Sequence, residues 1–480
     1  MATNRHSRNS SINIPQFSLV KKDVELVKPS KPTPLDIVLS FSSIDNLLVL
    51  EILTQTIFVY RPNSKSQTSD LHDDHDHNIE NNHHDDHDHD HDQQDPAEVI
   101  KEALSKALVY YYPLAGRLKR QQDDGRLKLT CNANGVPFLV ASADCSLSSL
   151  NYFDGIDLEI TKQFLFDSPP SDCPLVFQVT KFSCGGFAIG FGISHSVCDG
   201  FGVAQFFRAM AELSRGLNEP MVKPVWERER LVGNPTKDLL PPLVDKGGLA
   251  ISPQVPTSDE IVHECLSITS EGVKRLKEAS NNLNLTTIEV VGAFVWRARF
   301  RGLELNPEGK TCFYLITGIR KFLDPPLPEG YYGNAFLSSI VELPGKDLNE
   351  QPLSETAKLI KESKKRTLDK DFIKESVDSY ETLISQKKDV KMEANGAMMV
   401  LTDWRNLELM VKIGFAWEPV NITALPWDIF GYVDLCFLLP PPAKKSSDDS
   451  PRGTAARILV SLPRPAMAKF KKEMEPLLLS

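Results

Sequence analysis

The chain has 480 residues, of which 41% are hydrophobic and 25% are charged, and its formal net charge at pH 7 is −10. This length allows two or three domains with large cores, and the composition is that of an ordinary globular protein. No apolar run is long enough to span a membrane, and no basic surface is large enough to suggest nucleic-acid binding. The N-terminal residues contain no apolar signal-peptide core, so we expect a cytoplasmic protein.

Most of the negative charge lies in one segment, residues 70–95. This segment holds ten Asp, one Glu and eight of the 11 His, without Lys or Arg. Because it has no apolar periodicity, we expect a disordered insertion in a surface loop. Such a tract can bind Zn²⁺, Ni²⁺ or Cu²⁺ adventitiously, but composition of this kind more often reflects repeat expansion, and we expect no metal site. The eight cysteines include no CxxC pair, which argues against zinc and against a disulfide framework.

The first half of the chain alternates strand and helix signals. Apolar segments at 35–42 and 46–60 come first, and the β-branched and aromatic residues of the second one predict a strand. Asp95 and Pro96 combine an N-cap with proline at the first helical position, which predicts the start of a helix. Short strands are expected within 126–139. The segments 175–181 and 186–195 are expected to form an antiparallel pair joined across 183–186.

The stretch GFAIGFGISHSVCDG, residues 186–200, marks the strongest candidate site. Bulky residues alternate with Ala, Gly and Ser up to His195, as in a strand, and the period becomes helical after Asp199. His195 is thus expected to end a buried strand, and Asp199 to cap the next helix. A neutral imidazole in this position can act as a general base, because desolvation disfavours its charged form.

Simpler interpretations of the same residues exist. A histidine on an apolar strand is more often a packed core residue than a catalyst, and an aspartate at a helix start is more often only a cap. Cys198, between the two, is more simply a buried thiol than a nucleophile. The bare Ala and Gly face of the strand would let either a ligand or a second backbone approach closely.

The second half begins after residues 218–248, which are rich in Pro and charge and lack periodicity. They predict a crossover between a first domain, 1–217, and a second domain, 249–480. We expect helices at 269–282, 287–301, 353–370 and 466–478, and strands at 313–320, 398–402, 428–438 and 456–462. Each half mixes strands and helices without regular βαβ alternation, so the expected fold class is mixed α/β. No glycine-rich loop has the spacing of a nucleotide-binding fingerprint.

The segment His195-Ser-Val-Cys-Asp199-Gly200 resembles the HxxxDG signature of the plant BAHD acyltransferases, which acylate alcohols and amines from acyl-CoA. Other stretches resemble landmarks of this family in the same order and cover most of the chain. They are YYYPLAGRL at 110–118, PVWERERL at 224–231, TTIEVVGAFVWRAR at 286–299, GIRKFLDPPLPEGYYGN at 318–334 and LTDWRNL at 401–407. PVWERERL is most similar to the branch that contains benzyl alcohol benzoyltransferases and taxane acyltransferases.

The resemblance implies two similarly sized α/β domains, like those of chloramphenicol acetyltransferase, with a channel between them. In this channel His195 would take the proton of an acceptor alcohol, and the alkoxide would attack the thioester of acyl-CoA without a covalent acyl-enzyme. Asp199 would face away from the substrate and pair with Arg320, and both would support the site together with Gly200. The resemblance further implies a cytoplasmic monomer in plant specialised metabolism that binds no cofactor and uses acyl-CoA as its co-substrate.

Two further segments match family positions. Thr402 and Trp404 match a position implicated in contacts with the substrate or the developing oxyanion, although a strand-end threonine and a packed tryptophan would fit the same pattern. The second family signature, DFGWG, is eroded here. Its first four positions are taken by Gly414, Phe415, Ala416 and Trp417, and its final glycine is missing.

The eroded signature keeps other functions open. Because that signature is regarded as structural in the family, its loss leaves room for a catalytically silent relative that only binds its ligands. A condensation domain that forms peptide bonds shares the fold, but it would have a second histidine at Ser194 and a carrier domain nearby.

Overall fold

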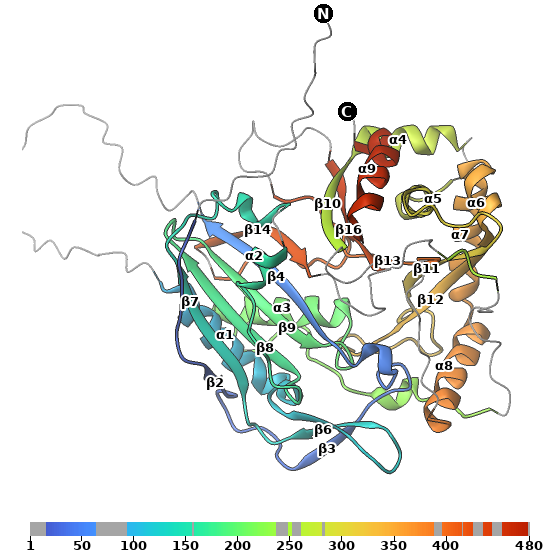
Figure 1. Ribbon diagram of the computed structural model, residues 1–480. Coiled ribbons are helices and arrows are strands. Elements are labelled where there is room, and N and C mark those ends of the chain that lie inside the picture. Colours follow the sequence, from blue (N-terminus) through green and yellow to red (C-terminus); the bar gives the residue numbers. More distant parts are fainter. Residues whose placement is uncertain are drawn as a thin grey trace, which may run out of the picture.

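The structure is a computed structural model that describes residues 16–63, 94–155, 158–236, 248–251, 261–280, 284–387, 396–414, 416–425, 435–443 and 454–478. Two large sheets, each flanked by helices, form the body of the chain (Figure 1). The predicted mixed α/β class is therefore confirmed. Of the predicted insertion at 70–95, residues 70–93 lie outside the described residues.

The first sheet has the strand order β1-β7-β8-β9-β4-β14, and β2 also pairs with β7. Its strands are β1 (Leu19–Lys21), β2 (Glu25–Val27), β4 (Leu53–Pro62), β7 (Val136–Ala143), β8 (Leu175–Phe182), β9 (Phe187–Ser194) and β14 (Trp417–Ala424). The antiparallel pairing of β8 with β9 confirms the predicted hairpin. A small separate sheet contains β3 (Ile37–Ser40), β6 (Leu127–Cys131) and β5 (Arg117–Arg120).

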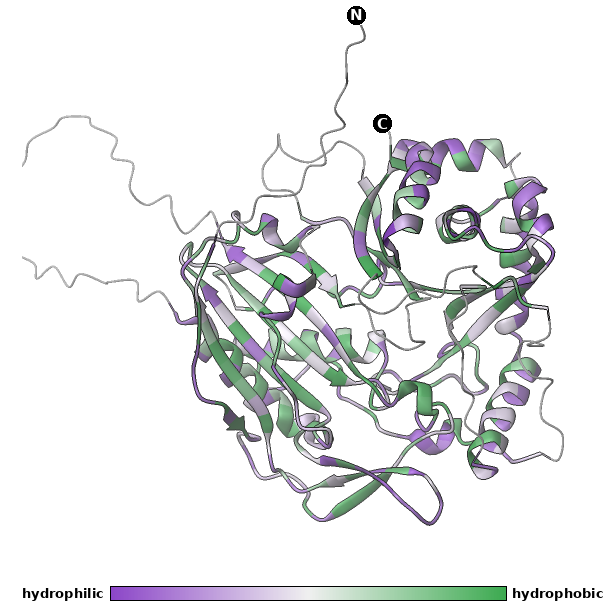
Figure 2. Cartoon of the chain, in the orientation of Figure 1, coloured by the Kyte–Doolittle hydropathy of each residue, from purple (hydrophilic) through white to green (hydrophobic). Residues whose placement is uncertain are grey.

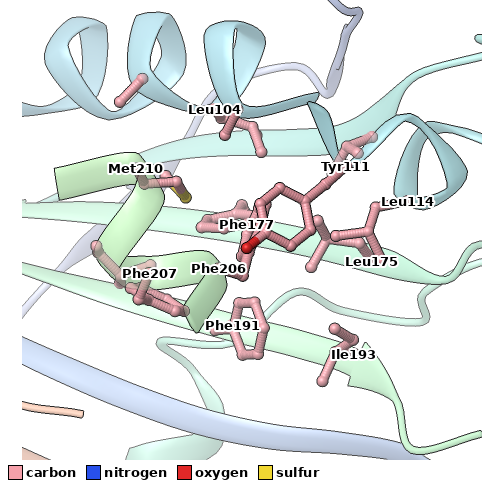
Figure 3. Packing of buried hydrophobic residues seen from close by; sticks show 14 of the residues in the cluster. Leu104, Tyr111, Leu114, Leu175, Phe177, Phe191, Ile193, Phe206, Phe207 and Met210 are labelled. Carbon is pink, nitrogen blue, oxygen red and sulfur yellow. The ribbon is translucent and has the colours of Figure 1, made fainter. Parts of the chain in front are cut away.

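Helices α1 (Pro96–Tyr110) and α3 (Gly200–Ser214) pack on each other and share a core with the first sheet. Asp95 caps α1 by accepting a hydrogen bond from the Ala97 N–H at 2.9 Å, as the sequence predicts. Figure 3 shows large apolar side chains between these helices and strands, among them Tyr111, Phe177, Phe191, Phe206 and Met210. Burying each such side chain stabilises the fold by about 1.5–3 kcal/mol relative to leaving it exposed. This core holds the end of β9 in place.

The bare face of β9 is covered by main chain. A Cβ added to Gly190 would lie 2.1 Å from the carbonyl oxygen of Phe164 and 3.1 Å from the Cα of Leu165. These residues follow the short helix α2 (Leu158–Lys162). Of the two expected occupants of this face, a second backbone is therefore the one observed at Gly190.

The second sheet has the order β10-β16-β15-β13-β11-β12. Its strands are β10 (Ile261–Thr269), β11 (Lys310–Gly318), β12 (Phe336–Pro344), β13 (Met398–Asp403), β15 (Leu435–Leu439) and β16 (Thr454–Pro463). The helices of this half are α4 (Ser270–Ala279), α5 (Thr287–Gly302), α6 (Gly345–Glu350), α7 (Leu353–Thr367), α8 (Lys370–Ser385) and α9 (Arg464–Leu478). Figure 2 shows hydrophobic and hydrophilic residues side by side on these helices, as expected for helices that bury one face.

Several elements differ from the sequence-based expectations. Strands β10, β12 and β14 and helix α8 were not among the predicted elements. The predicted helix at 353–370 ends at Thr367, because Asp369 caps α8 by accepting from the N–H groups of Asp371 and Phe372. The largest difference is β14, which comes from the range assigned to the second domain but pairs antiparallel with β4 in the first sheet.

A buried arginine joins the two large sheets. Arg457 of β16 is only 1% exposed. Its guanidinium donates to the carbonyl oxygens of Ile422 in β14 and Pro440, at 3.1 and 3.0 Å, and pairs with Asp154 at 2.9 Å. Through Arg457, the second sheet is thus hydrogen-bonded to β14, the strand of the first sheet that comes from the second half of the chain.

We expect Arg457→Leu to lower the free energy of unfolding by about 2–4 kcal/mol, because two carbonyl oxygens and a carboxylate lose their donor. Urea unfolding followed by tryptophan fluorescence measures the change. Lys469→Leu is the control, because its ion pair with Glu304 is half exposed and should contribute at most about 1 kcal/mol. Equal losses in both variants would contradict a joining role for Arg457.

Candidate active site

The predicted strand–turn–helix around His195 is observed. His195 follows the last residue of β9, and its N–H donates to the carbonyl oxygen of Ile52 at 2.9 Å. Asp199 caps α3 by accepting from the Gly202 N–H at 3.1 Å. The turn between them is fixed by Arg228, whose Nη2 donates to the carbonyl oxygen of Val197 at 2.7 Å.

The imidazole of His195 lies against an amide that fixes its tautomer. Its Nδ1 is 3.1 Å from Oδ1 of Asn334. The Nδ2 group of Asn334 donates to the carbonyl oxygen of His195 and to Oδ1 of Asp45, both at 2.7 Å. Because these two acceptors fix the NH₂ end, the amide oxygen faces the ring and must accept from a protonated Nδ1. The pattern therefore assigns the imidazole lone pair to Nε2.

Asp199 and Arg320 form the pair that the resemblance implies. The guanidinium donates to both carboxylate oxygens, at 2.7 and 2.8 Å, and also to the carbonyl oxygen of Gly333 at 2.7 Å. The carboxylate accepts a further hydrogen bond from the Ala335 N–H at 3.2 Å. The pair thereby fastens the loop between β11 and β12 to the turn that carries His195.

Burial decides the charge states of this cluster. Burial lowers the pKa of His195, with smaller opposing effects from a hydrogen bond to its own main chain and from Asp199, Asn334 and Asp45. For Asp199, burial raises the pKa, but the charge and hydrogen bonds of Arg320 and the N–H groups of the α3 cap and the loop outweigh it, so the net shift is downward. Burial also raises the pKa of Cys198 well above its usual value. At neutral pH the site therefore contains a neutral imidazole, a carboxylate and a protonated thiol.

The segment 401–407, which carries Thr402 and Trp404, packs against Gly200 at the start of α3. A Cβ on Gly200 would lie 2.6 Å from Cδ1 of Leu407, so the start of α3 packs against the segment 401–407. The N–H of Trp404 donates to the carbonyl oxygen of Leu438 at 2.8 Å, and its ring meets Phe437 edge-on at 5.1 Å. Thr402 is partly buried at the end of β13. The role of Thr402 and Trp404 in substrate contacts stays a prediction.

The eroded signature lies at the other end of β9. Trp417 begins β14, packs edge-on against Phe187 at 5.4 Å, and donates through Nε1 to the carbonyl oxygen of Gly185 at 3.3 Å. Phe187 is the first residue of β9, so this contact is about 25 Å from His195 at the usual rise of a strand. The position of Trp417 fits a structural motif rather than a catalytic one.

The neighbours of Trp417 show how the eroded signature is accommodated. Gly414 has a φ of +62°, a left-handed conformation that glycine adopts without strain. The carbonyl oxygen of Ala416 accepts from the Asn63 N–H at 2.7 Å. Phe415 lies outside the described residues.

The described part of the chain offers neither a metal cluster nor a membrane-spanning helix. Within it, no group of three or more His, Cys, Asp or Glu side chains is placed to hold a metal ion. The helices found there are all too short or too polar to cross a bilayer.

Three residues of the site were missed by sequence reasoning. Asn334 and Arg228 lie inside the stretches 318–334 and 224–231, but nothing in their spacing links them to His195. Asp45 lies between the two predicted apolar segments, 35–42 and 46–60, and it is 0% exposed in the structure. Because its neighbours Ser43 and Asn46 are polar and acidic residues are usually exposed, no local signal in the sequence identifies Asp45 as part of the site.

The comparisons with known proteins agree with this architecture. Residues 78–477 match a family model described as Transferase family. Spermidine sinapoyl-CoA acyltransferase from Arabidopsis thaliana is 38% identical over 466 residues, covering 94% of this chain and 96% of the relative. Spermidine coumaroyl-CoA acyltransferase from the same plant is 39% identical over 473 residues, covering 95% of each. 3'-N-debenzoyl-2'-deoxytaxol N-benzoyltransferase from Taxus canadensis is 31% identical over 472 residues, covering 96% and 97%.

Solved structures support the fold independently. The crystal structure of vinorine synthase has a TM-score of 0.69 at 22% identity, covering 96% of this chain and 98% of that one. That of F. graminearum TRI101 complexed with coenzyme A and deoxynivalenol has a TM-score of 0.67 at 15% identity, covering 91% and 97%. Fold and sequence together define an acyltransferase. The chain belongs to the BAHD transferase family, and the predicted resemblance, including its taxane acyltransferase relatives, is confirmed.

Proposed function

We propose that the protein transfers an acyl group from acyl-CoA to a small-molecule acceptor, with His195 as the general base. The observation that carries the proposal is the contact of Nδ1 with Asn334, which assigns the lone pair to Nε2. His195 as a residue is partly buried, and its ring lies where the end of β9 meets the loop between β11 and β12. A base at this junction fits an acceptor and a thioester that meet in a channel between the two halves.

In the proposed reaction Nε2 takes the proton of the acceptor as its oxygen or nitrogen attacks the thioester carbonyl. The tetrahedral intermediate collapses, the C–S bond breaks, and the CoA thiolate recovers the proton from His195. Thr402 and Trp404 are proposed donors to the developing oxyanion, and Asp199 and Arg320 are proposed to hold the turn of His195. No covalent acyl-enzyme and no metal or further cofactor is needed. We expect a cytoplasmic monomer.

The acceptor class separates two candidates. The sequence-based prediction is an alcohol of plant specialised metabolism. The two spermidine acyltransferases, at 38% and 39% identity, favour an aliphatic polyamine that is acylated on nitrogen. Sinapoyl-CoA and coumaroyl-CoA are the acyl donors that these relatives suggest.

A crossed panel of acyl-CoAs and acceptors, analysed by mass spectrometry, tests the proposal. The panel should include sinapoyl-, coumaroyl-, benzoyl- and acetyl-CoA with spermidine and benzyl alcohol as acceptors. We expect an amide of spermidine or an ester of an alcohol, and the mass of the product decides between the candidates. Tight binding of CoA without turnover for any pair would instead support the silent relative that the eroded signature leaves open.

The pH dependence provides a second test. Burial lowers the pKa of His195, so the imidazole is already neutral at pH values somewhat below about 6.5, the usual pKa of histidine. With an alcohol acceptor we therefore expect kcat/KM to rise from acid pH with an apparent pKa below 6.5 and to stay level above it. With spermidine the rise should continue towards about pH 10, because the amine must also lose its proton before it attacks. An inflection above pH 7 with an alcohol would contradict a buried neutral base.

A further inference from the structure

We infer that Asp45 is a positioning residue that determines which nitrogen of His195 acts as the base, acting through the amide of Asn334. The inference rests on the proposed function, because it explains how the proposed base is held in its active tautomer. Asp45 lies outside every stretch that resembles a family landmark, and it does not contact the imidazole through any hydrogen bond described above.

The contacts of Asp45 show a carboxylate built into the protein. Its Oδ1 accepts from Nδ2 and from the main-chain N–H of Asn334, at 2.7 and 3.2 Å. Its Oδ2 accepts from the Ser42 N–H at 3.1 Å, and its own N–H donates to Oγ of Ser42 at the same distance. Asp45, Ser42 and Asn334 are all 0% exposed. The carboxylate therefore has one orientation, and Asn334 is held at two points.

A buried cation compensates the charge of Asp45. Nε of Arg228 lies 3.6 Å from Oδ2 of Asp45, and Arg228 is 1% exposed. The guanidinium is held over the rings of Trp226, Tyr331 and Tyr332, with its central carbon 4.3, 5.2 and 5.0 Å from their centroids. A buried carboxylate next to a buried guanidinium is paired rather than isolated, and an ionised carboxylate only accepts hydrogen bonds.

This charge makes the two orientations of the Asn334 amide unequal. In the observed one, the NH₂ group faces two acceptors, Asp45 and the carbonyl oxygen of His195. In the flipped one, the amide oxygen would face both of them without a proton between, and two buried hydrogen bonds would be lost. The amide oxygen is thereby directed to Nδ1, which must carry the proton, and the lone pair is placed on Nε2.

Asp45→Asn removes one of the two acceptors that hold this orientation, with little change in shape, and leaves only the carbonyl oxygen of His195. The new NH₂ group at position 45 can donate to the amide oxygen of a flipped Asn334. The NH₂ group of Asn334 then donates to Nδ1, and the ring proton moves to Nε2. Nε2 can no longer accept a proton in that tautomer. We expect kcat to fall by about 10–100-fold with KM for acyl-CoA unchanged within about twofold. This loss is smaller than the about 10⁴-fold seen when an aspartate bonded directly to a catalytic histidine is replaced by its amide, because Asp45 acts through Asn334.

The experiment combines kinetics with NMR of the ¹⁵N-histidine-labelled full chain, in which the signals of His195 are assigned by their loss in His195→Ala. In the unaltered protein Nδ1 should have the shift of a protonated ring nitrogen and Nε2 that of an unprotonated one. In Asp45→Asn the two shifts should move towards each other. Asp154→Asn is the matched control, because it also removes a carboxylate paired with a buried arginine, and it should change neither the tautomer nor kcat.

A second pair of variants tests whether Asp45 acts through Asn334. Asn334→Ala should lower kcat, and the double variant with Asp45→Asn should be no slower than Asn334→Ala within about twofold. Additive losses, an unchanged tautomer in Asp45→Asn, or an unprotonated Nδ1 in the unaltered protein would each overturn the inference. The NMR readout does not depend on turnover, so an absence of acyl transfer would overturn the proposed function while the tautomer still tests Asp45. If Asp45→Asn fails to fold, the tautomer of the unaltered protein and the rate of Asn334→Ala still decide.

Discussion

His195→Ala is expected to lower kcat for acyl transfer by about 10³-fold and to leave the fold intact. General acid–base catalysis by a positioned side chain contributes about 10²–10⁴-fold to rates, and this variant removes the proposed base altogether. The main chain at this position keeps its hydrogen bonds, because the N–H to Ile52 and the carbonyl oxygen to Asn334 do not depend on the side chain. We therefore expect an unchanged circular dichroism spectrum and an unchanged affinity for CoA.

The release of free CoA thiol, measured with and without acceptor, gives the rate. His263→Ala is the matched control, because His263 is the other histidine in the described part of the chain and its Nδ1 contacts Oγ of Ser461 at 2.7 Å on the second sheet. We expect His263→Ala to keep kcat within about twofold. A similar loss in both variants would show that histidine removal acts through stability rather than through the base.

Arg320→Leu is expected to lower the free energy of unfolding by about 3–5 kcal/mol, because it leaves the carboxylate of Asp199 buried without its counter-charge. Asp199 is only 6% exposed, so water cannot easily replace the guanidinium. The variant should also lose most of its activity, since the same guanidinium holds the loop that carries Asn334. Urea unfolding at pH 7 measures the first effect, and the CoA-release assay measures the second.

The ionisation of Asp199 determines how the stability loss of Arg320→Leu depends on pH. The pKa of Asp199 is lowered in the folded protein, so its pairing stabilises the fold fully above the unfolded pKa of about 3.9. This contribution is lost as the pH falls through the lower folded pKa. The difference between the unaltered protein and Arg320→Leu should therefore be largest at neutral pH and shrink in acid. Arg208→Leu is the control, because its pair with Glu408 is exposed and should contribute at most about 1 kcal/mol.

The sequence was most informative where the structural signal is local. The strand that ends before His195 and the helix capped by Asp199 were predicted because the apolar period changes within a few residues. The pairing of Asp199 with Arg320 was available only from the family resemblance, because the two residues are joined by tertiary contacts. The structure shows this contact as two hydrogen bonds from Arg320 to the carboxylate of Asp199.

The missed elements depend on distant neighbours. β14 contains Pro419, which argues against a central strand, and it is tolerated because β14 lies at the edge of the sheet and its register shifts between Pro419 and Asn421. Asn334 and Asp45 could not be connected with His195 for a similar reason. Their proposed roles depend on hydrogen bonds between residues that are far apart in the sequence. The periodicity of the sequence gives no information about such contacts. β12 was missed for a different reason: every second residue is buried, but its sequence FLSSIVELP does not alternate between apolar and polar residues.

The most direct test of His195 as the base of an acyl transfer is product formation from an acyl-CoA and an acceptor by the unaltered protein and by His195→Ala in one assay. We predict an acylated product and stoichiometric CoA from the unaltered protein, with the initial rate about 10³-fold lower in the variant. An equal rate of product formation by folded His195→Ala would contradict it.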